Sequence, residues 1–254
     1  MLRRCKVFLC SVLIVGMLSS INIFAATPTE SNDPTANTQV QQNNQLSESD
    51  KVAIRESLKK YDVNEETISN LLKKLEYGEL WNSLDPQYRD TATHESISNE
   101  NGITIDKYVY PDGSIMIQEF SSPAITAEGY QESDIVRTLG QVSGGTVTQG
   151  SGFLSVKRAM VNNSWVIISM KFYTDYTFVN GGYDNIDNVY DYVIQTLGGT
   201  YSNTSLTINK QTETSSGPAL ATVESDYSGP AGSIHVWLKL NVGSERAWAT
   251  NNSI

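Results

Sequence analysis

The two histidines, His94 and His235, are the first residues to consider for chemistry, because imidazole exchanges protons readily near neutral pH. A Ser-His-Asp triad would also need an activated serine, but no Gly-x-Ser-x-Gly motif occurs. His94 lies in the polar run Thr-Ala-Thr-His-Glu, which predicts a solvated loop, and alternation puts His235 on the side of its strand away from the core. A Ser-x-x-Lys match at residues 57–60 falls within a helical pattern that explains it. We therefore expect no catalytic residue among them.

Paired carboxylates are the second chemistry that the sequence permits. Glycoside hydrolysis needs two facing carboxyl groups, one of them with a raised pKa. Glu119, Asp175, Glu224 and Asp226 fall on predicted strands. Each is equally a solvent-facing residue of an alternating pattern. A secreted hydrolase of the glycosidase type is therefore the alternative function rather than the first one.

The densest polar cluster runs from Asn180 to Asn188. In it and just beyond it, Asp184, Asn185, Asp187 and Asp191 offer the oxygen ligands that calcium prefers. Their spacing matches neither an EF-hand nor a nonapeptide loop. Since Asn, Asp and Gly also form ordinary turns, an ordinary loop is the alternative to a calcium site, and no other cofactor is indicated.

Aromatic side chains are the last candidates for a site. Alternation assigns Trp165, Tyr173 and Trp237 to faces opposite the core, and a single surface containing these exposed flat rings would stack on sugars or bind another protein. The alternative is that a second sheet or the N-terminal helices bury the tryptophans, with Trp81 among the covering side chains, since large aromatics are usually buried. The expected partner is accordingly an extracellular glycan or protein.

Residues 1–25 have the three zones of a secretory signal. Arg3, Arg4 and Lys6 precede an apolar run over residues 7–18, and a small residue, Ala25, follows. The apolar run is too short and too interrupted to anchor the chain in a bilayer. We expect cleavage after Ala25, secretion, and no membrane association of the mature protein.

Cleavage would change both the redox chemistry and the charge of the chain. The two cysteines, Cys5 and Cys10, lie inside the signal, so the mature protein would contain neither disulfides nor a thiol nucleophile. Loss of three basic residues would change the formal net charge from −10 to −13. Such an acidic chain is not expected to bind nucleic acid.

The organisation of the chain follows from shifts in composition and periodicity. Residues 26–49 are polar and repetitive and predict a disordered linker. Residues 50–85 show an apolar period typical of a short helical hairpin, introduced by a cap at Ser47 and ended at Gly78. Two short amphipathic helices need a surface to cover, and the later domain, a partner or each other would provide it.

Residues 101–254 show the period of two that is typical of strands. A β-hairpin over 103–120 turns at Pro111-Asp112-Gly113, and a core domain follows over 129–254. Only Val189 to Leu197 is ambiguous between strand and helix. The fold class is mainly β, an antiparallel β-sandwich or partly open barrel preceded by a short helical hairpin. Its strands are expected at residues 103–110, 114–120, 152–161, 165–179, 200–210, 220–227, 233–242 and 246–250.

Two stretches carry a resemblance to known sequences. Tyr61 to Leu84, with its Gly-Glu-Leu-Trp, and Tyr173 to Tyr190 resemble segments of uncharacterised secreted proteins of Gram-positive bacteria. The resemblance implies secretion and a shared architecture, and it supplies no catalytic residue. The leading hypothesis is a secreted, non-enzymatic binding or structural protein. A secreted hydrolase and a secreted antagonist or toxin are the alternatives.

Overall fold

Two short helices begin the part of the chain that the computed structural model describes, which comprises residues 46–98, 103–121, 124–125 and 142–252. Helix α1 (Glu48–Lys59) is capped by the Ser47 hydroxyl, which accepts from the Asp50 amide, and α2 (Glu65–Glu76) is capped by Asn64. Gly78, with a φ of 75°, lies just past the end of α2, as predicted. The predicted signal peptide and most of the predicted linker lie outside the described residues.

Apolar stripes on both helices are fully buried, so this segment packs within the same unit as the sheets. Ile54, Leu58, Ile68 and Leu71 are each 0 % exposed, and they belong to one hydrophobic cluster with side chains of both sheets. The described residues all fall in the unit Gln42–Ile254. Of the three surfaces considered for the helices, the later domain is therefore the one they cover, and none of the described helices is long and apolar enough to cross a bilayer.

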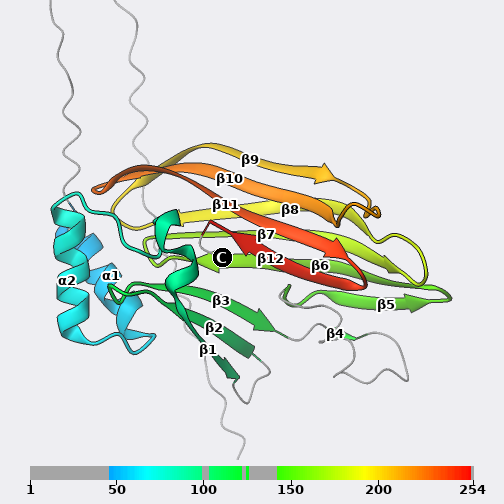
Figure 1. The fold of residues 1–254 in the computed structure, drawn as a ribbon, viewed down its shortest axis with the longest axis horizontal. Helices are drawn as coiled ribbons and strands as arrows, with labels where there is room; N and C mark the ends of the chain where they lie inside the picture. The colour runs from blue at the N-terminus through cyan, green and yellow to red at the C-terminus, as the bar shows by residue number, and fades with distance from the viewer. Residues whose placement is uncertain (1–45, 99–102, 122–123, 126–141, 253–254) are drawn as a thin grey trace, which may run out of the picture. The chain divides into compact units, whose positions relative to one another are not determined.

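Within the described residues, the larger sheet has eight strands and begins after a short 3₁₀ helix, η1 (Pro86–Thr91). Its central path is β1-β2-β3-β6-β5-β4, with β7 beside β6 and β8 beside β7 (Figure 1). All pairs are antiparallel except β4 with β5. The strands are β1 (Thr93–Ser98), β2 (Ile103–Val109), β3 (Ile115–Ser121), β4 (Ala124–Ile125), β5 (Thr146–Gly150), β6 (Phe153–Ser164), β7 (Ile168–Val179) and β8 (Asn185–Thr196).

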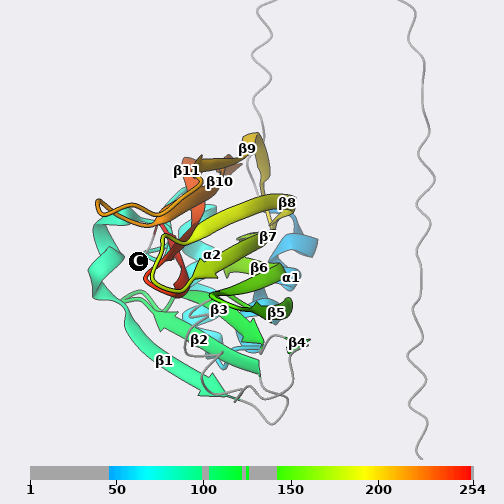
Figure 2. The same cartoon turned by 90° about the vertical axis from the view of Figure 1, so that its right-hand side faces the viewer.

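The smaller sheet has four antiparallel strands in the order β12-β11-β10-β9. These are β9 (Thr200–Lys210), β10 (Ala219–Gly229), β11 (Gly232–Gly243) and β12 (Arg246–Asn251). Seen along the strands, β9, β10 and β11 form a layer against β8, β7 and β6 (Figure 2). Alternate residues of β7 and of β10 are buried between these layers, which is how a sandwich forms its core. The fold is mainly β, and the sandwich is the alternative that the structure adopts.

Three local predictions were wrong or incomplete. The turn between the two long strands lies at Trp165-Val166-Ile167, three residues after the predicted Asn162-Asn163-Ser164, which belongs to β6. The ambiguous segment at 189–197 is strand as far as Thr196, as part of β8. His94 lies on β1 rather than in a loop, where its ring stacks on Tyr108.

Candidate functional site

The three aromatic residues predicted to share one binding surface lie in three different environments. Trp165 is 0 % exposed at the β6–β7 turn, so its assignment to an outer face was wrong. Tyr173 lies on the outer face of the larger sheet, on the side of β7 away from the core. Trp237 lies on the outer face of the smaller sheet, also partly exposed. Tyr173 and Trp237 therefore belong to opposite sides of the sandwich and cannot contact one small ligand together.

The four residues proposed to bind calcium do not converge. Asp184 is 1 % exposed and accepts hydrogen bonds from the backbone amides of Val179 and Glu245. Asp187 is engaged by Lys157 and Thr177 on the outer face of the sheet, whereas Asn185 pairs with Thr212. Asp191 is exposed on β8. Asp184 contacts the turn between β11 and β12 through the Glu245 amide and does not face the other three residues. No group of three or more acidic, His or Cys residues in the described part of the chain is arranged to hold a metal ion.

The two histidines considered for catalysis contact carboxylates of neighbouring strands. His235 contacts Asp226 at 2.8 Å and Glu224 at 3.6 Å, and all three side chains are more than a third exposed. Hydrogen bonds from Asn203 and His235 lower the pKa of Asp226. His94 pairs with Asp106 at 3.1 Å. The His235 contacts lie on the surface, whereas Asp106 is buried at 8 % exposure, and neither histidine has a nucleophile among its described contacts.

Two tyrosines lie side by side on the larger sheet's outer face, one on β7 and one on β8, which pairs only with β7 among the described strands. Tyr173 on β7 is directly opposite Tyr190 on β8, and their rings are nearly parallel with centroids 6.4 Å apart. Both side chains are partly exposed. The guanidinium of Arg158, on β6, lies 4.9 Å from the centre of the Tyr173 ring. We call this surface, formed by the outward side chains of β6, β7 and β8 around the two tyrosines, the tyrosine face.

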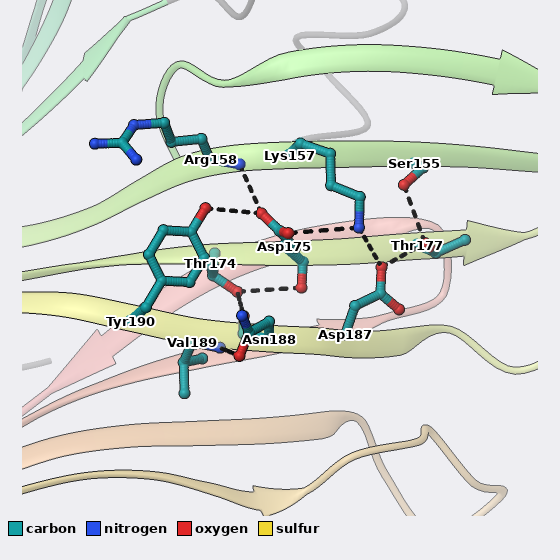
Figure 3. A network of polar contacts seen from close by, with 10 residues as sticks. All are labelled: Ser155, Lys157, Arg158, Thr174, Asp175, Thr177, Asp187, Asn188, Val189 and Tyr190. Carbon is teal, nitrogen blue, oxygen red and sulfur yellow. Dashed lines mark hydrogen bonds and ion pairs between the residues drawn. The ribbon is translucent and has the colours of Figure 1, made fainter.

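Asp175 holds the tyrosine face in place (Figure 3). Its Oδ1 accepts from the Tyr190 hydroxyl at 2.9 Å and from the Arg158 backbone amide at 2.8 Å, and its Oδ2 lies 3.5 Å from Lys157 Nζ. Lys157 also reaches Asp187 at 3.3 Å. Partial burial, reinforced by the carboxylate of Asp175, raises the pKa of Tyr190 to about 12, so the phenol stays protonated and donates. One carboxylate thereby fixes a ring and two strands.

Irregular strand pairings flank the tyrosine row. The pairing of β6 with β7 shifts between Val156 and Ala159, and that of β7 with β8 shifts between Lys171 and Tyr173. Arg158 and Asp191 have φ values of 60° and 52° beside these shifts, and their charged ends lie 3.8 Å apart. Bulges and left-handed non-glycine residues are over-represented next to functional sites, where they redirect side chains. Here they bring a cation and an anion to the edge of the tyrosine row.

A pocket of about 250 Å³ continues the tyrosine face toward the helices. Two cross-strand rows form part of its lining, Asn162–Lys171–Val193 and Ser164–Ser169–Gln195. Lys60 and Tyr61, which follow α1, and Glu119 of β3 line it as well. Sequence reasoning missed this pocket because its residues come from five elements. The alternation of β7 did place Ser169, Lys171 and Tyr173 on one face, which was the available signal.

The smaller sheet has its own aromatic residues on its outer face. Trp237 of β11 has Lys239 Nζ 4.1 Å from its ring centre, and Trp248 of β12 has the Arg246 guanidinium at 5.7 Å. Trp248 pairs with Asn241, four residues along β11 from Trp237, so the two rings are separated along the strands. Each ring is covered on one side by its cation. None of the described pockets borders this face.

Comparison with known proteins adds no assignment. No model of a known protein family matches the sequence, and no curated protein matches it. Among solved structures, the chain is similar to a hypothetical protein from Listeria monocytogenes EGD-e, with a TM-score of 0.31 and 18 % identity over 64 % of this chain and 94 % of that one.

Proposed function

We propose that this chain is an exported, non-enzymatic binding protein that engages an extracellular glycan through its tyrosine face. The observation that carries the proposal is the stacked cross-strand pair of Tyr173 and Tyr190, both partly exposed, with the Tyr190 hydroxyl held by Asp175 and the Tyr173 ring against Arg158. Rings that are already held in position can stack on a sugar without losing side-chain freedom on binding. The ion-paired Lys157, Asp187 and Asp175 nearby offer hydrogen-bonding groups to sugar hydroxyls.

The hydrolase alternative finds less support in the arrangement of carboxylates. Asp175 and Asp187 share the ammonium of Lys157 on an open sheet, and Asp226 has a lowered rather than a raised pKa. A general acid needs a raised pKa and access to its substrate. Burial, with the nearby charges of Glu213 and Glu245, does raise the pKa of Asp184, but this side chain is 1 % exposed and holds backbone amides.

Export is the other part of the proposal. Two features of the sequence support it: residues 1–25 resemble a secretory signal, and residues 61–84 and 173–190 resemble segments of secreted proteins of Gram-positive bacteria. Finding the processed protein in culture medium with its N-terminus at residue 26 would support it. Retention of the uncut chain inside the producing cells would contradict it.

Binding to a glycan array, followed by calorimetry on the strongest binder, tests the site. Tyr173→Ala should weaken that binding about tenfold or more, because a central aromatic contact is removed. Trp237→Ala removes a partly exposed ring from the opposite side of the sandwich and is the matched control, expected to leave affinity unchanged. Equal loss in both variants, or full affinity in Tyr173→Ala, would refute binding through the tyrosine face.

A further inference from the structure

The pocket beside the tyrosine face contains polar side chains that the described residues leave without partners. Lys171, Ser169 and Gln195 line it, and none of the three side chains makes a hydrogen bond or ion pair with the described part of the chain. Register places them together, because Ser169 is opposite Gln195 and Lys171 is two residues further along β7 on the same face. One ammonium, one hydroxyl and one amide therefore converge on the same small space.

The charges around this pocket favour an anion. Lys60 reaches Glu119 at 3.4 Å and lies 3.0 Å from the Tyr61 hydroxyl, which itself donates to Glu119, so the one carboxylate of the lining is already engaged. Lys171 adds a positive charge with no compensating acid among the described contacts. In a chain with 28 acidic and 18 basic residues, a pocket with two lysines and one glutamate stands out.

The volume restricts the size of the ligand. At about 250 Å³ the pocket falls below the roughly 300–1,000 Å³ of sites for drug-sized molecules, so it suits a single sugar-sized unit. Lys171 and Tyr173 point to the same face of β7, with Cα atoms about 7 Å apart at the usual rise of a strand. A glycan running along β7 would therefore place one unit against the tyrosines and its neighbour in the pocket.

We propose that this pocket, the lysine pocket, binds the carboxylate of an acidic sugar unit. Lys171 supplies the ion pair, while Ser169 and Gln195 donate hydrogen bonds to the carboxylate oxygens or to the adjacent ring hydroxyls. This inference rests on the proposed function and refines it, from a glycan in general to a carboxylated glycan. The tyrosines contribute stacking, and the lysine pocket contributes the selectivity for charge.

Matched monosaccharides test the proposal on the purified mature chain. Glucuronate against glucose, and galacturonate against galactose, differ only in the carboxylate. Titration followed by amide NMR should show saturable shifts at residues 169–171 and 193–195 with at least one uronate, and binding of the neutral partner should be about tenfold weaker or worse. Because the contact is ionic, added salt should weaken uronate binding.

Single-lysine variants separate this site from general attraction to the surface. Lys171→Met should weaken uronate binding about tenfold, whereas Lys73→Met, which removes an exposed lysine of α2 that has no ion pair with the described residues, should not. Any of four results would overturn the proposal. These are equal shifts with neutral sugars, shifts outside the pocket, no saturable shift with any of the four sugars, and tighter binding of sulfated than of carboxylated sugars.

If Tyr173→Ala abolishes glycan binding while the charge of the sugar and Lys171→Met have no effect, the lysine pocket fails and the proposed function stands. If uronates occupy the pocket while Tyr173→Ala leaves oligosaccharide binding unchanged, the tyrosine face fails instead.

Discussion

Asp112 shows how one side chain connects the helices to the sheets. It lies at the turn between β2 and β3, and its side chain is 12 % exposed. One oxygen accepts from the Ser114 amide and hydroxyl, and the other accepts from the Asn82 amide and pairs with Lys74 of α2 at 2.8 Å. Burial alone would raise the pKa of Asp112, but these hydrogen bonds outweigh it and hold the pKa below its usual range.

The lowered pKa of Asp112 predicts that the free energy of unfolding depends on pH in the acidic range. Because the folded pKa lies below the unfolded one, ionised Asp112 stabilises the fold above about pH 4, and this stabilisation is lost as the pH falls through the folded pKa. Asp112→Asn should reduce the free energy of unfolding by roughly 1–3 kcal/mol at pH 7, and the deficit should shrink below about pH 4. Urea unfolding over this pH range measures it.

Asp90→Asn is the control, since Asp90 is exposed in η1 and has no described partner. It should change the free energy of unfolding by less than about 0.5 kcal/mol at any pH. A deficit in Asp112→Asn that is the same at pH 3 as at pH 7 would show that the carboxylate charge contributes nothing.

At the residue scale, the sequence assigned Tyr173 to the correct face of its strand and Trp165 to the wrong one, and both outcomes have the same physical reason. Side chains alternate along a strand, so the assignment of a face holds only within an uninterrupted strand. Tyr173 lies well inside β7, whereas Trp165 lies at the true turn. Composition favoured the turn at Asn162-Asn163-Ser164, because those residues form turns readily. The real turn instead places Val166 at a φ of 70°, which is uncommon for a β-branched residue.

At the scale of the elements, the contact between the β2–β3 turn and α2 requires a glycine at position 113, because a larger residue would not fit. Gly113 has a φ of 81°, and a methyl group at this position would lie far inside van der Waals contact with the Thr67 methyl. Gly113→Ala should therefore lower the free energy of unfolding by roughly 2–4 kcal/mol, the sum of a left-handed backbone and a steric clash. Chemical denaturation of the variant measures this.

Gly181 offers a matched control for the backbone cost. Its φ is 70°, but a methyl group there would meet nothing within 4 Å, so Gly181→Ala should cost only about 1–2 kcal/mol. Adding Thr67→Ala to Gly113→Ala should recover the steric part and leave the backbone part. If Gly113→Ala and Gly181→Ala are equally destabilised, the turn does not pack against α2 as described.

Most elements could be predicted because their patterns are local. The caps at Ser47 and Gly78, the Pro111-Asp112-Gly113 turn and the alternation of β7 are each set by neighbouring residues. Strand β5 lies in a stretch rich in Gly, Ser and Thr with little apolar signal, so it was missed. The lysine pocket and the division of the strands between two sheets depend on contacts distant in sequence, which periodicity does not encode.

For the whole molecule, the division into two sheets determines what a ligand can contact. Tyr173 and Trp237 were expected to cooperate because both alternate away from the core, but a sandwich has two outer faces. The same alternation therefore separates them by the full thickness of both sheets. In the part of the chain that the structure describes, the larger sheet's outer face combines a tyrosine pair, two irregular pairings and a neighbouring pocket, which is why it is the better candidate for binding.

The shared core predicts that helices and sheets unfold together. Leu71 of α2 is 0 % exposed, and its carbonyl accepts from the buried indole of Trp81, within a cluster that includes side chains of both sheets. Leu71→Ala should lower the free energy of unfolding by roughly 2–5 kcal/mol, and by the same amount whether far-UV circular dichroism or tryptophan fluorescence follows the transition. Val52→Ala, at a position of α1 that is 59 % exposed, is the control and should change it by less than about 0.5 kcal/mol. If the protein instead shows two separate unfolding transitions and Leu71→Ala shifts only the helical one, the helices are an independent unit. Lys60 and Tyr61, which form one wall of the lysine pocket, would then not be a fixed part of the site.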